Sequence, residues 1–246
     1  SIEELYELLG KFKSRCIVIP HHPLWHMDFS SHDPELERLI EIYSIWGSSE
    51  YRSNNLQFLS EKQPGYIHNE SIREVLNRGY QYGLLASGDS HLQYPGDPFP
   101  VSKIRPPVTP TTSKEGIIFG PGKMAVFAPE LTRDAIWQAM YNRNCYATTG
   151  ARIVLQFHIN GVSMGLKTCI EKAPEISIFA TGTDDLSIVE IIKNGEVMHQ
   201  SSVQGYETSI KFVDSNFAED SWYYAKIVQD DGETAWSSPI WVYRKC

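Results

Sequence analysis

Residues 70–91 read ESIREVLNRGYQYGLLASGDSH, and this stretch decides the fold that we expect. Its first half places apolar residues at helical spacing, which predicts a helix over about 70–81. The short apolar run at 84–87 that follows is typical of a buried strand. A helix that leads into such a strand indicates a parallel α/β sheet or barrel, in which functional residues gather on loops at the carboxyl ends of the strands.

The same alternation of helices and short strands extends over residues 1–150. Further helices are predicted at about 1–13, 35–39 and 133–142, and further strands at 16–20, 40–44 and 124–127. The segment 93–122 is rich in Pro, Gly, Ser and Thr, and we expect it to form a lid or a binding loop.

The pattern changes near Gly150. From there on, short runs alternate apolar and polar residues with a period of two, which is typical of half-exposed strands. The clearest runs lie at 176–179, 188–192 and 222–228, and the strongest hairpin signals are Asn194-Gly195 and Asp231-Gly232. We therefore expect two domains: an α/β domain over 1–150 and an antiparallel β-sandwich over 151–246.

The composition is that of a folded globular chain. Of its 246 residues, 41% are hydrophobic and 21% are charged, which suits one large or two modest domains. The 30 acidic and 22 basic residues give a formal charge of -8, and no Lys/Arg block points to nucleic acid. No apolar run approaches the ~18–20 residues of a membrane span. We expect a soluble protein with no nucleic-acid or membrane partner, and no sorting signal assigns a compartment.

The loop after the first predicted strand is rich in residues that bind metals. Pro20-His21-His22-Pro23 follows that strand, and His26, Asp28 and His32 come soon after. Neutral imidazole is the commonest metal-binding side chain, and the end of a strand would hold it rigidly. The alternative is a polar surface loop that happens to contain several histidines. Two adjacent histidines at a strand end favour the metal site.

Two further segments carry carboxylates at or near strands. After the strand at 84–87, Asp89 and His91 are two residues apart and can project toward one cation, although Asp89 could equally cap a turn. Glu41 lies inside the apolar run at 40–44, where a carboxylate is costly unless it is paired or bound to a cation. Either Glu41 supports a metal-bound histidine, or it faces solvent or an arginine.

Taken in order, these segments resemble the motifs of a known family. His-His-Pro after a strand, Glu41-Ile42-Tyr43-Ser44, Ala86–His91 and Asn144–Gly150 are similar to motifs of the PHP (polymerase and histidinol phosphatase) superfamily, and most similar to a branch of carbamate-ester hydrolases. The resemblance implies an α/β fold, the C-terminal part of a distorted (β/α)7 barrel followed by an antiparallel β-sandwich. It also implies two or three divalent metal ions (zinc, manganese or iron), with His22, Asp89 and His91 as ligands.

The sequence departs from this family at one point. The family's first motif is H-x-H on the first barrel strand, and this chain contains no H-x-H. We therefore expect residues 1–150 to be half of a barrel, with the other half missing before Ser1 or supplied by another chain. Self-association through the predicted helix at 1–13 and strand at 16–20 would cover the open edge.

Together these features predict a metal-dependent hydrolase that uses a metal-activated water. Its substrate would be a small-molecule phosphoester or a carboxyl or carbamate ester. His22, Asp89 and His91 would bind the metal, and His21, His26 or Glu41 would assist proton transfer. The alternative is a non-catalytic protein whose β-sandwich binds carbohydrate or protein through exposed aromatic residues among Trp222, Tyr223, Tyr224, Trp236 and Trp241.

Overall fold

The structure is a computed structural model that describes residues 1–27, 29–52, 54, 70–89, 111–113, 116–118 and 120–244. For residues 13, 14, 25, 26, 111–113 and 116–118 it describes the backbone alone. Three predicted features therefore lie outside the described residues: Asp28, His91 and most of the predicted lid at 93–122.

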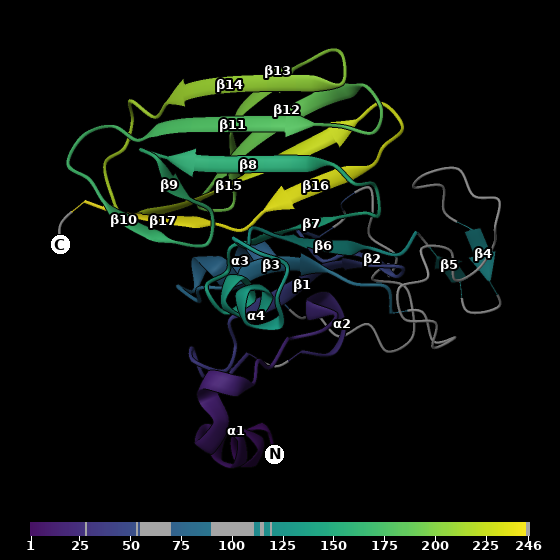
Figure 1. Ribbon diagram of the computed structural model, residues 1–246, viewed down its shortest axis with the longest axis vertical. Coiled ribbons are helices and arrows are strands. Elements are labelled where there is room, and N and C mark those ends of the chain that lie inside the picture. Colours follow the sequence, from purple (N-terminus) through teal and green to yellow (C-terminus); the bar gives the residue numbers. More distant parts are fainter. Residues whose placement is uncertain are drawn as a thin grey trace.

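Strands dominate the described part of the chain (Figure 1). The helices are short: α1 (Ile2–Leu9), the 3-10 helix η1 (Gly10–Arg15), α2 (Pro23–His26), α3 (Ile72–Asn77) and α4 (Arg133–Tyr141). The strands up to residue 150 are β1 (Leu39–Ser44), β2 (Gly47–Ser48), β3 (Gly83–Ala86), β4 (Thr111–Ser113), β5 (Gly116–Ile118), β6 (Lys123–Val126) and β7 (Cys145–Thr148). The later strands are β8 (Val154–Ile159), β9 (Val162–Ser163), β10 (Lys167–Cys169), β11 (Glu175–Thr181), β12 (Leu186–Lys193), β13 (Glu196–Ser202), β14 (Glu207–Val213), β15 (Ser221–Gln229), β16 (Thr234–Ser237) and β17 (Ile240–Tyr243).

Two sheets pack face to face in the upper part of the molecule (Figure 1). The smaller sheet has the order β14-β11-β8-β9. The larger follows the path β10-β17-β15-β16-β7-β6, and β12 joins it beside β15 and carries β13. Buried and exposed residues alternate along β8, so that Leu155, Phe157 and Ile159 contribute to the core between the sheets. The period-two pattern of the sequence thus produces one apolar face on each sheet.

The clearest strand predictions agree with the structure. The runs at 176–179, 188–192 and 222–228 fall within β11, β12 and β15. Both predicted hairpin turns are confirmed, because Asn194-Gly195 joins β12 to β13 and Asp231-Gly232 joins β15 to β16. The five aromatic residues considered as exposed binding residues are instead buried in the core: Trp222, Tyr223, Tyr224, Trp236 and Trp241.

The predicted (β/α)7 barrel is wrong, because the described residues form no closed barrel and their architecture is mostly β. β1 and β3 are parallel, and α3 lies between them in the chain. Among the described residues, however, this sheet has only the three strands β2-β1-β3. The strands β6 and β7 are antiparallel and belong to the large sheet. A barrel of this kind needs parallel strands that close on themselves. β7 instead pairs with β16 and is therefore part of the sandwich.

The large sheet contains strands from both sides of residue 150. β6 and β7 precede this point, whereas β10, β12, β13, β15, β16 and β17 follow it. The division into domains at 1–150 and 151–246 stays a prediction, since a shared sheet neither fixes nor excludes a domain boundary.

The predicted helix at 35–39 is also wrong. The Asp33 carboxylate accepts hydrogen bonds from the backbone N–H groups of Glu35 (2.9 Å) and Leu36 (3.2 Å). Such local side-chain bonds hold the backbone in a turn and compete with helix formation. The chain therefore turns here and enters β1 at Leu39.

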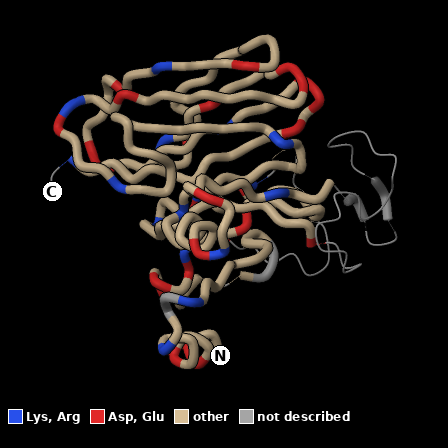
Figure 2. Tube along the Cα trace, in the orientation of Figure 1, with Lys and Arg blue, Asp and Glu red and all other residues tan. Residues whose placement is uncertain are grey.

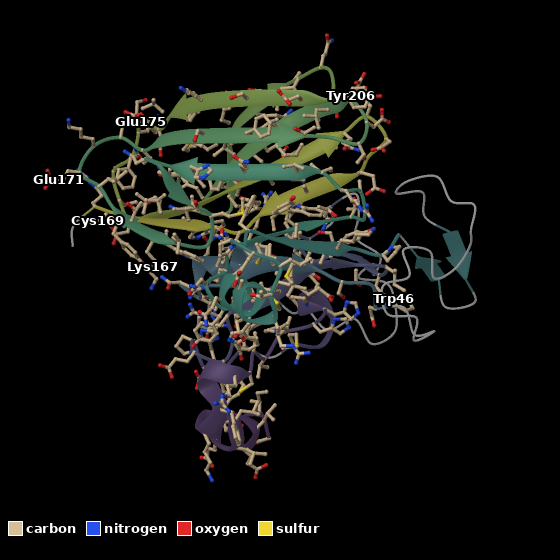
Figure 3. The ribbon with its side chains drawn as sticks, viewed as in Figure 1. Trp46, Lys167, Cys169, Glu171, Glu175 and Tyr206 are labelled. Atoms are coloured by element: carbon tan, nitrogen blue, oxygen red, sulfur yellow. The ribbon has the colours of Figure 1, made fainter. Side chains whose placement is uncertain are left out.

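The first helix stands apart from the sheets at the N-terminus (Figures 1 and 3). Ser1 and Glu4 form a capping box at its start. The predicted helix at 1–13 becomes α1 followed by η1, and the segment 16–20 is not a strand. Leu8 and Phe12 are 64% and 53% exposed. Self-association through this surface stays a prediction.

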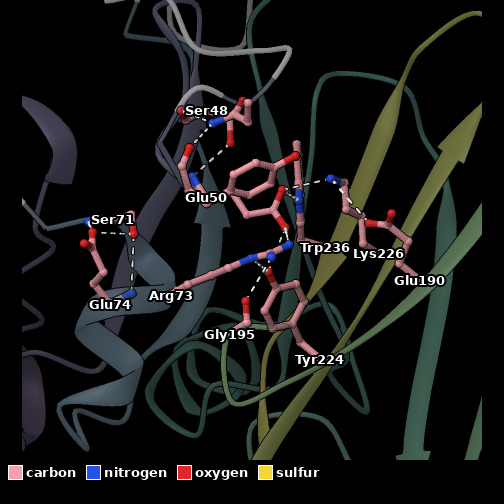
Figure 4. Close-up of polar contacts among 12 residues, drawn as sticks. Ser48, Glu50, Ser71, Arg73, Glu74, Glu190, Gly195, Tyr224, Lys226 and Trp236 are labelled. Atoms are coloured by element: carbon pink, nitrogen blue, oxygen red, sulfur yellow. Dashed lines mark hydrogen bonds and ion pairs between the residues drawn. The ribbon is translucent and has the colours of Figure 1, made fainter. Parts of the chain in front are cut away.

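A buried network around Glu50 connects the small β1–β3 sheet to the sandwich (Figure 4). Glu50 is 1% exposed, and its carboxylate forms ion pairs with Arg73 of α3 (2.7 Å) and Lys226 of β15 (3.0 Å). It also accepts hydrogen bonds from Tyr224 (2.7 Å) and from the indole N–H of Trp236 (2.9 Å). Burial alone would raise the pKa of Glu50, but the charges of Lys226 and Arg73 outweigh burial and hold this pKa below its ordinary value.

Three surface and chemical features of the described residues remain: their charges, their cysteines and the character of their helices. Acidic and basic residues are interspersed along the trace (Figure 2). Cys169 is disulfide-bonded, whereas Cys16 and Cys145 carry free thiols. Among the described residues, no helix has both the length and the apolar character that crossing a membrane would require.

Replacing Glu50 with glutamine is expected to lower the free energy of unfolding by about 3–5 kcal/mol, because it leaves the buried charge of Arg73 without its counter-ion and Lys226 with Glu190 alone. Urea denaturation followed by circular dichroism measures this loss. The exposed variant Glu196→Gln on the β12–β13 hairpin is the control and should change stability by less than about 0.5 kcal/mol. A loss below about 1 kcal/mol for Glu50→Gln would contradict this role of the network.

Candidate metal centre

Three chain segments bring the candidate site residues together. His21 and His22 follow the segment 16–20, which is tied to β1 by a hydrogen bond from the Glu41 N–H to the Pro20 carbonyl (3.1 Å). Glu41 lies within β1, and Asp89 comes three residues after β3 ends. β1 and β3 are parallel neighbours, and Glu41 pairs with Leu85, four residues before Asp89, so both carboxylates lie near the edge of the sheet at which β3 ends.

Two of these residues have an unusual backbone conformation. His22 has a φ of 51° and Asp89 a φ of 42°, both in the left-handed region. Residues other than glycine rarely adopt this region, and doing so costs of order 1–3 kcal/mol. At His22 the turn is followed at once by Pro23, the first residue of α2. These turns direct the His22 and Asp89 side chains toward each other.

Two imidazoles and two carboxylates converge at this edge of the sheet. His21 lies between both carboxylates, with Nδ1 2.9 Å from Glu41 Oε1 and Nε2 3.3 Å from Asp89 Oδ2. His22 Nε2 lies 2.9 Å from the same Asp89 oxygen, and His22 Nδ1 lies 3.8 Å from Glu41 Oε1. The centroids of the two imidazole rings are 3.7 Å apart.

Glu41 lies deepest in this cluster, with a side chain that is 5% exposed. One carboxylate oxygen faces His21, and the other accepts a hydrogen bond from the Ser87 hydroxyl, just after β3. A buried carboxylate needs such partners to offset the loss of hydration. Of the two alternatives from the sequence, the structure places Glu41 against histidine rather than against solvent or arginine.

The two histidines have pKa values shifted in opposite directions. Burial alone would lower the pKa of His21, but its hydrogen bond to Glu41 and the charges of Glu41 and Asp89 outweigh burial and raise it. The pKa of His22 is lowered, chiefly by burial and then by the charge of His21, against the opposing effect of both carboxylates. This shift favours the neutral form of His22, the form that binds metals.

The donor set fits a divalent metal ion. His21, His22 and Asp89 each offer one ligand atom, and these atoms all lie within 4.8 Å of one another. Nitrogen and oxygen ligands of this kind suit zinc, and also manganese or iron. Glu41 lies against the other ring nitrogen of His21, the position from which a carboxylate commonly orients a metal-binding imidazole.

Other residues of the predicted site lie elsewhere or are not described. His91 lies outside the described residues, and so does the side chain of His26. His32 is held in a different cluster, with Nδ1 2.9 Å from both Glu37 Oε2 and the Tyr82 hydroxyl. Sequence reasoning missed Ser87 as a partner of Glu41, although its position at the end of a buried strand, two residues before Asp89, was a usable signal.

The cluster around Glu37 is a second buried polar group. Glu37 is 3% exposed and accepts a hydrogen bond from the Tyr82 hydroxyl, and the His32 ring stacks on Tyr80 with centroids 4.3 Å apart. Burial raises the pKa of Glu37 from 4.5 to about 7, against the opposing hydrogen bond from Tyr82. This carboxyl thus changes its charge near neutral pH.

The chain is similar to bacterial proteins without an assigned function. A family model described as a protein of unknown function, DUF3604, matches residues 70–174. An uncharacterised protein of Chlamydia pneumoniae is 32% identical over 234 residues, which cover 87% of this chain and 36% of that protein. Uncharacterised proteins of Chlamydia muridarum and Chlamydia trachomatis are 31% and 30% identical over 241 residues, with the same coverage. The chain thus spans little more than a third of the length of these relatives.

Likenesses to solved structures are weak. The CARDB domain of the PF1109 protein of Pyrococcus furiosus, solved in complex with di-metal ions, has a TM-score of 0.26 and 12% identity, over 38% of this chain and 96% of that chain. An engineered protein has a TM-score of 0.24 and 14% identity, over 37% of this chain and 20% of that chain. Neither likeness supports a conclusion about this chain.

These findings correct the resemblance to the PHP superfamily. No PHP family model matches the chain, and the family model that does match is DUF3604. The largely β architecture also differs from the barrel which that resemblance implied. Two of the short motifs on which it rested, His-His-Pro and D-x-H, describe metal-binding chemistry, and such chemistry occurs on many unrelated folds.

The raised pKa of Glu37 predicts a pH-dependent stability. Between about pH 4.5 and 7 the carboxyl is ionised in the unfolded chain but protonated in the folded protein. Unfolding then releases a proton, so the free energy of unfolding falls as the pH rises through this window, by about 3 kcal/mol in total. The lowered pKa values of His22 and His32 act in the opposite direction in both proteins, so urea denaturation at pH 5 and pH 7.5 should show this fall as the difference between the wild type and Glu37→Gln.

The matched control for this experiment is Glu35→Gln, which alters an exposed carboxylate two residues away. Its stability should depend on pH as the wild type does. If Glu37→Gln retains the full pH dependence, another group titrates in this window and the prediction is wrong.

Proposed function

We propose that this protein is a metal-dependent hydrolase that cleaves a phosphoester or a carboxyl or carbamate ester of a small molecule. The observation that carries the proposal is the convergence of His21, His22 and Asp89, with Glu41 of β1 behind them, near the carboxyl end of β3. One divalent ion or more (zinc, manganese or iron) would be held there. When bound, such an ion lowers the pKa of a coordinated water and polarises the oxygen of the substrate.

The burial of each side chain indicates its role in this site. The His22 and Asp89 side chains are 17% and 16% exposed, and they would hold the ion from the inner side. His21 is 47% exposed and completes the group where solvent and substrate can reach it. Glu41 accepts a hydrogen bond from His21 Nδ1–H, which would leave Nε2 to bind the ion. The same carboxylate would take up a proton released at the site.

The proposal predicts that the purified full chain binds zinc or manganese and loses it in His22→Ala and Asp89→Asn. Mass spectrometry of metal content after dialysis gives the stoichiometry, and calorimetric titration gives the affinity. Asp134→Asn removes an exposed carboxylate at the start of α4 and should bind metal as the wild type does. Wild-type protein that retains no metal, or ligand variants that retain it all, would contradict the proposal.

Activity is tested with p-nitrophenyl phosphate and p-nitrophenyl acetate on metal-loaded protein. Glu41→Gln is expected to bind metal about 10–100-fold more weakly and to lose activity in proportion, because a neutral amide oxygen accepts the His21 hydrogen bond more weakly than a carboxylate does and cannot take up a proton. Ser87→Ala, which removes one hydrogen bond to Glu41, should have a smaller effect in the same direction. Turnover of neither ester by protein with a full complement of metal would overturn the hydrolase assignment while leaving the metal site intact.

A further inference from the structure

Two arginines lie together at the end of the small sheet opposite to the candidate metal centre. Arg38 immediately precedes β1, and Arg143 comes two residues after α4 ends. The N–H of Gly83, at the start of β3, donates to the Arg38 carbonyl (2.9 Å), and a Cβ on Gly83 would lie 2.7 Å from the Arg143 Cβ. Both arginines therefore flank the start of β3, whereas Asp89 lies beyond its end.

Trp241 of β17 brings a third cation, Lys167, to the same place. The Arg143 guanidinium lies over the Trp241 ring, 5.4 Å from its centroid, and Lys167 of β10 is the residue paired with Trp241 between the two strands. Burial lowers the pKa of Lys167, and the charges of Arg143 and then Arg38 lower it further. The three cations thus act on one another, and we call Arg38, Arg143 and Lys167 the cation cluster.

The cation cluster has no carboxylate partner among the described residues, since none of its members forms an ion pair there. Arg38 Nε donates instead to the Tyr141 carbonyl, and Arg143 Nε to the Gln81 carbonyl, each at 2.8 Å. Burial lowers the pKa of Arg143 to about 10, and the charge of Arg38 adds to this effect, so Arg143 stays cationic at neutral pH. A buried cation without a counter-ion is unfavourable, so the cluster attracts an anion.

Donor atoms of the cluster remain available to such an anion. No hydrogen bond within the described part uses the two Nη atoms of Arg143 or Nη2 of Arg38. None of these nitrogens is among the buried atoms that lack a partner, so each keeps contact with solvent. Tyr243, two residues after Trp241, accepts a hydrogen bond from Gln81 Nε2 (2.7 Å) and can donate its own hydroxyl hydrogen.

The backbone at Arg143 is also unusual. Its φ is 61°, in the left-handed region, and its N–H donates to the Met140 carbonyl (3.0 Å) at the end of α4. Glycine or asparagine is the ordinary residue at such a helix end, because other residues are strained there. Arginine at this position places a guanidinium at the start of β3 at a cost in backbone conformation.

We propose that the cation cluster binds a phosphate group, either as the free anion or as the phosphomonoester of a small molecule. The two Nη atoms of Arg143 bind two phosphate oxygens, as the planar guanidinium commonly does. Arg38 and Lys167 supply the remaining positive charge, and Tyr243 donates a hydrogen bond. A phosphate monoester carries about two negative charges and three acceptor oxygens, which suits three cations better than the single charge of a carboxylate.

The test is a titration of the full 15N-labelled chain with inorganic phosphate, followed by amide chemical shifts. The protein is first stripped of metal with EDTA and then dialysed, so that the candidate metal centre cannot hold the phosphate. At about 0.15 M salt, which screens distant charges, phosphate should shift the amides of residues 38, 83, 143, 167 and 243 with a Kd on the order of 1 mM. The amides of residues 21, 22 and 89 should not shift.

Two further ligands define the class. Glycerol phosphate separates the two sources of the phosphate group: tighter binding than inorganic phosphate assigns a phosphomonoester, and weaker binding assigns the free anion. Acetate tests the charge argument, because a monovalent carboxylate should bind at least several-fold more weakly than phosphate.

Arg143→Gln and Arg38→Gln should each weaken phosphate binding about tenfold or more, because each removes a charged hydrogen-bond donor. Tyr243→Phe, which removes only the hydroxyl, should weaken it less. If Arg143→Gln fails to fold by circular dichroism, Arg38→Gln and Lys167→Gln carry the test.

Matched controls are Arg133→Gln at the start of α4 and Lys211→Gln on β14, which remove the same charge at exposed positions outside the cluster. They should leave the Kd for phosphate unchanged. The proposal is overturned if phosphate shifts none of the cluster amides, if the cluster variants bind as well as the controls, or if acetate binds as tightly as phosphate.

Discussion

The position of the small β1–β3 sheet against the sandwich depends on the ion pairs and hydrogen bonds of the buried Glu50 carboxylate. A charge with 1% exposure is stable only if its hydration is replaced, and the replacements come from α3 on one side and from β15 and β16 on the other. Because the partners belong to elements far apart in the chain, the network forms only when the small sheet sits correctly against the sandwich. We expect these buried ion pairs to fix how the small sheet docks on the sandwich rather than to add net stability.

The candidate metal centre depends on this docking through the small sheet. Glu41 is on β1 and Asp89 follows β3, so their separation is set by the pairing of these two strands. β3 is fixed in turn by a hydrogen bond from the Leu84 N–H to the Ser238 hydroxyl (2.9 Å), which lies between β16 and β17. The sandwich therefore acts as the rigid support of a site to which, among the described residues, it contributes no ligand.

Local patterns predicted local structure well and long-range pairing poorly. The run before Asp89 reads as a buried strand, and Asn194-Gly195 reads as a hairpin turn, because each signal lies within a few residues. Proximity of His22 and Asp89 was predicted from two strand ends, of which only β3 is a strand in the structure. The direction and partner of β7 depend on β16, and the partners of Glu50 lie up to 186 residues away, so no window of sequence reveals them. The motifs therefore predicted that His22 and Asp89 lie close together but were misleading about the barrel.

The pairing of Thr148 in β7 with Ala235 in β16 has a consequence for how the protein is made. A ribosome adds residues one after another, so β7 emerges long before the strand that completes its side of the sheet. Until then one edge of β7 has unpaired backbone groups, and the buried partners of Glu50 do not yet exist. The sheet that contains β7 therefore cannot be complete until residues 234–237 have left the ribosome.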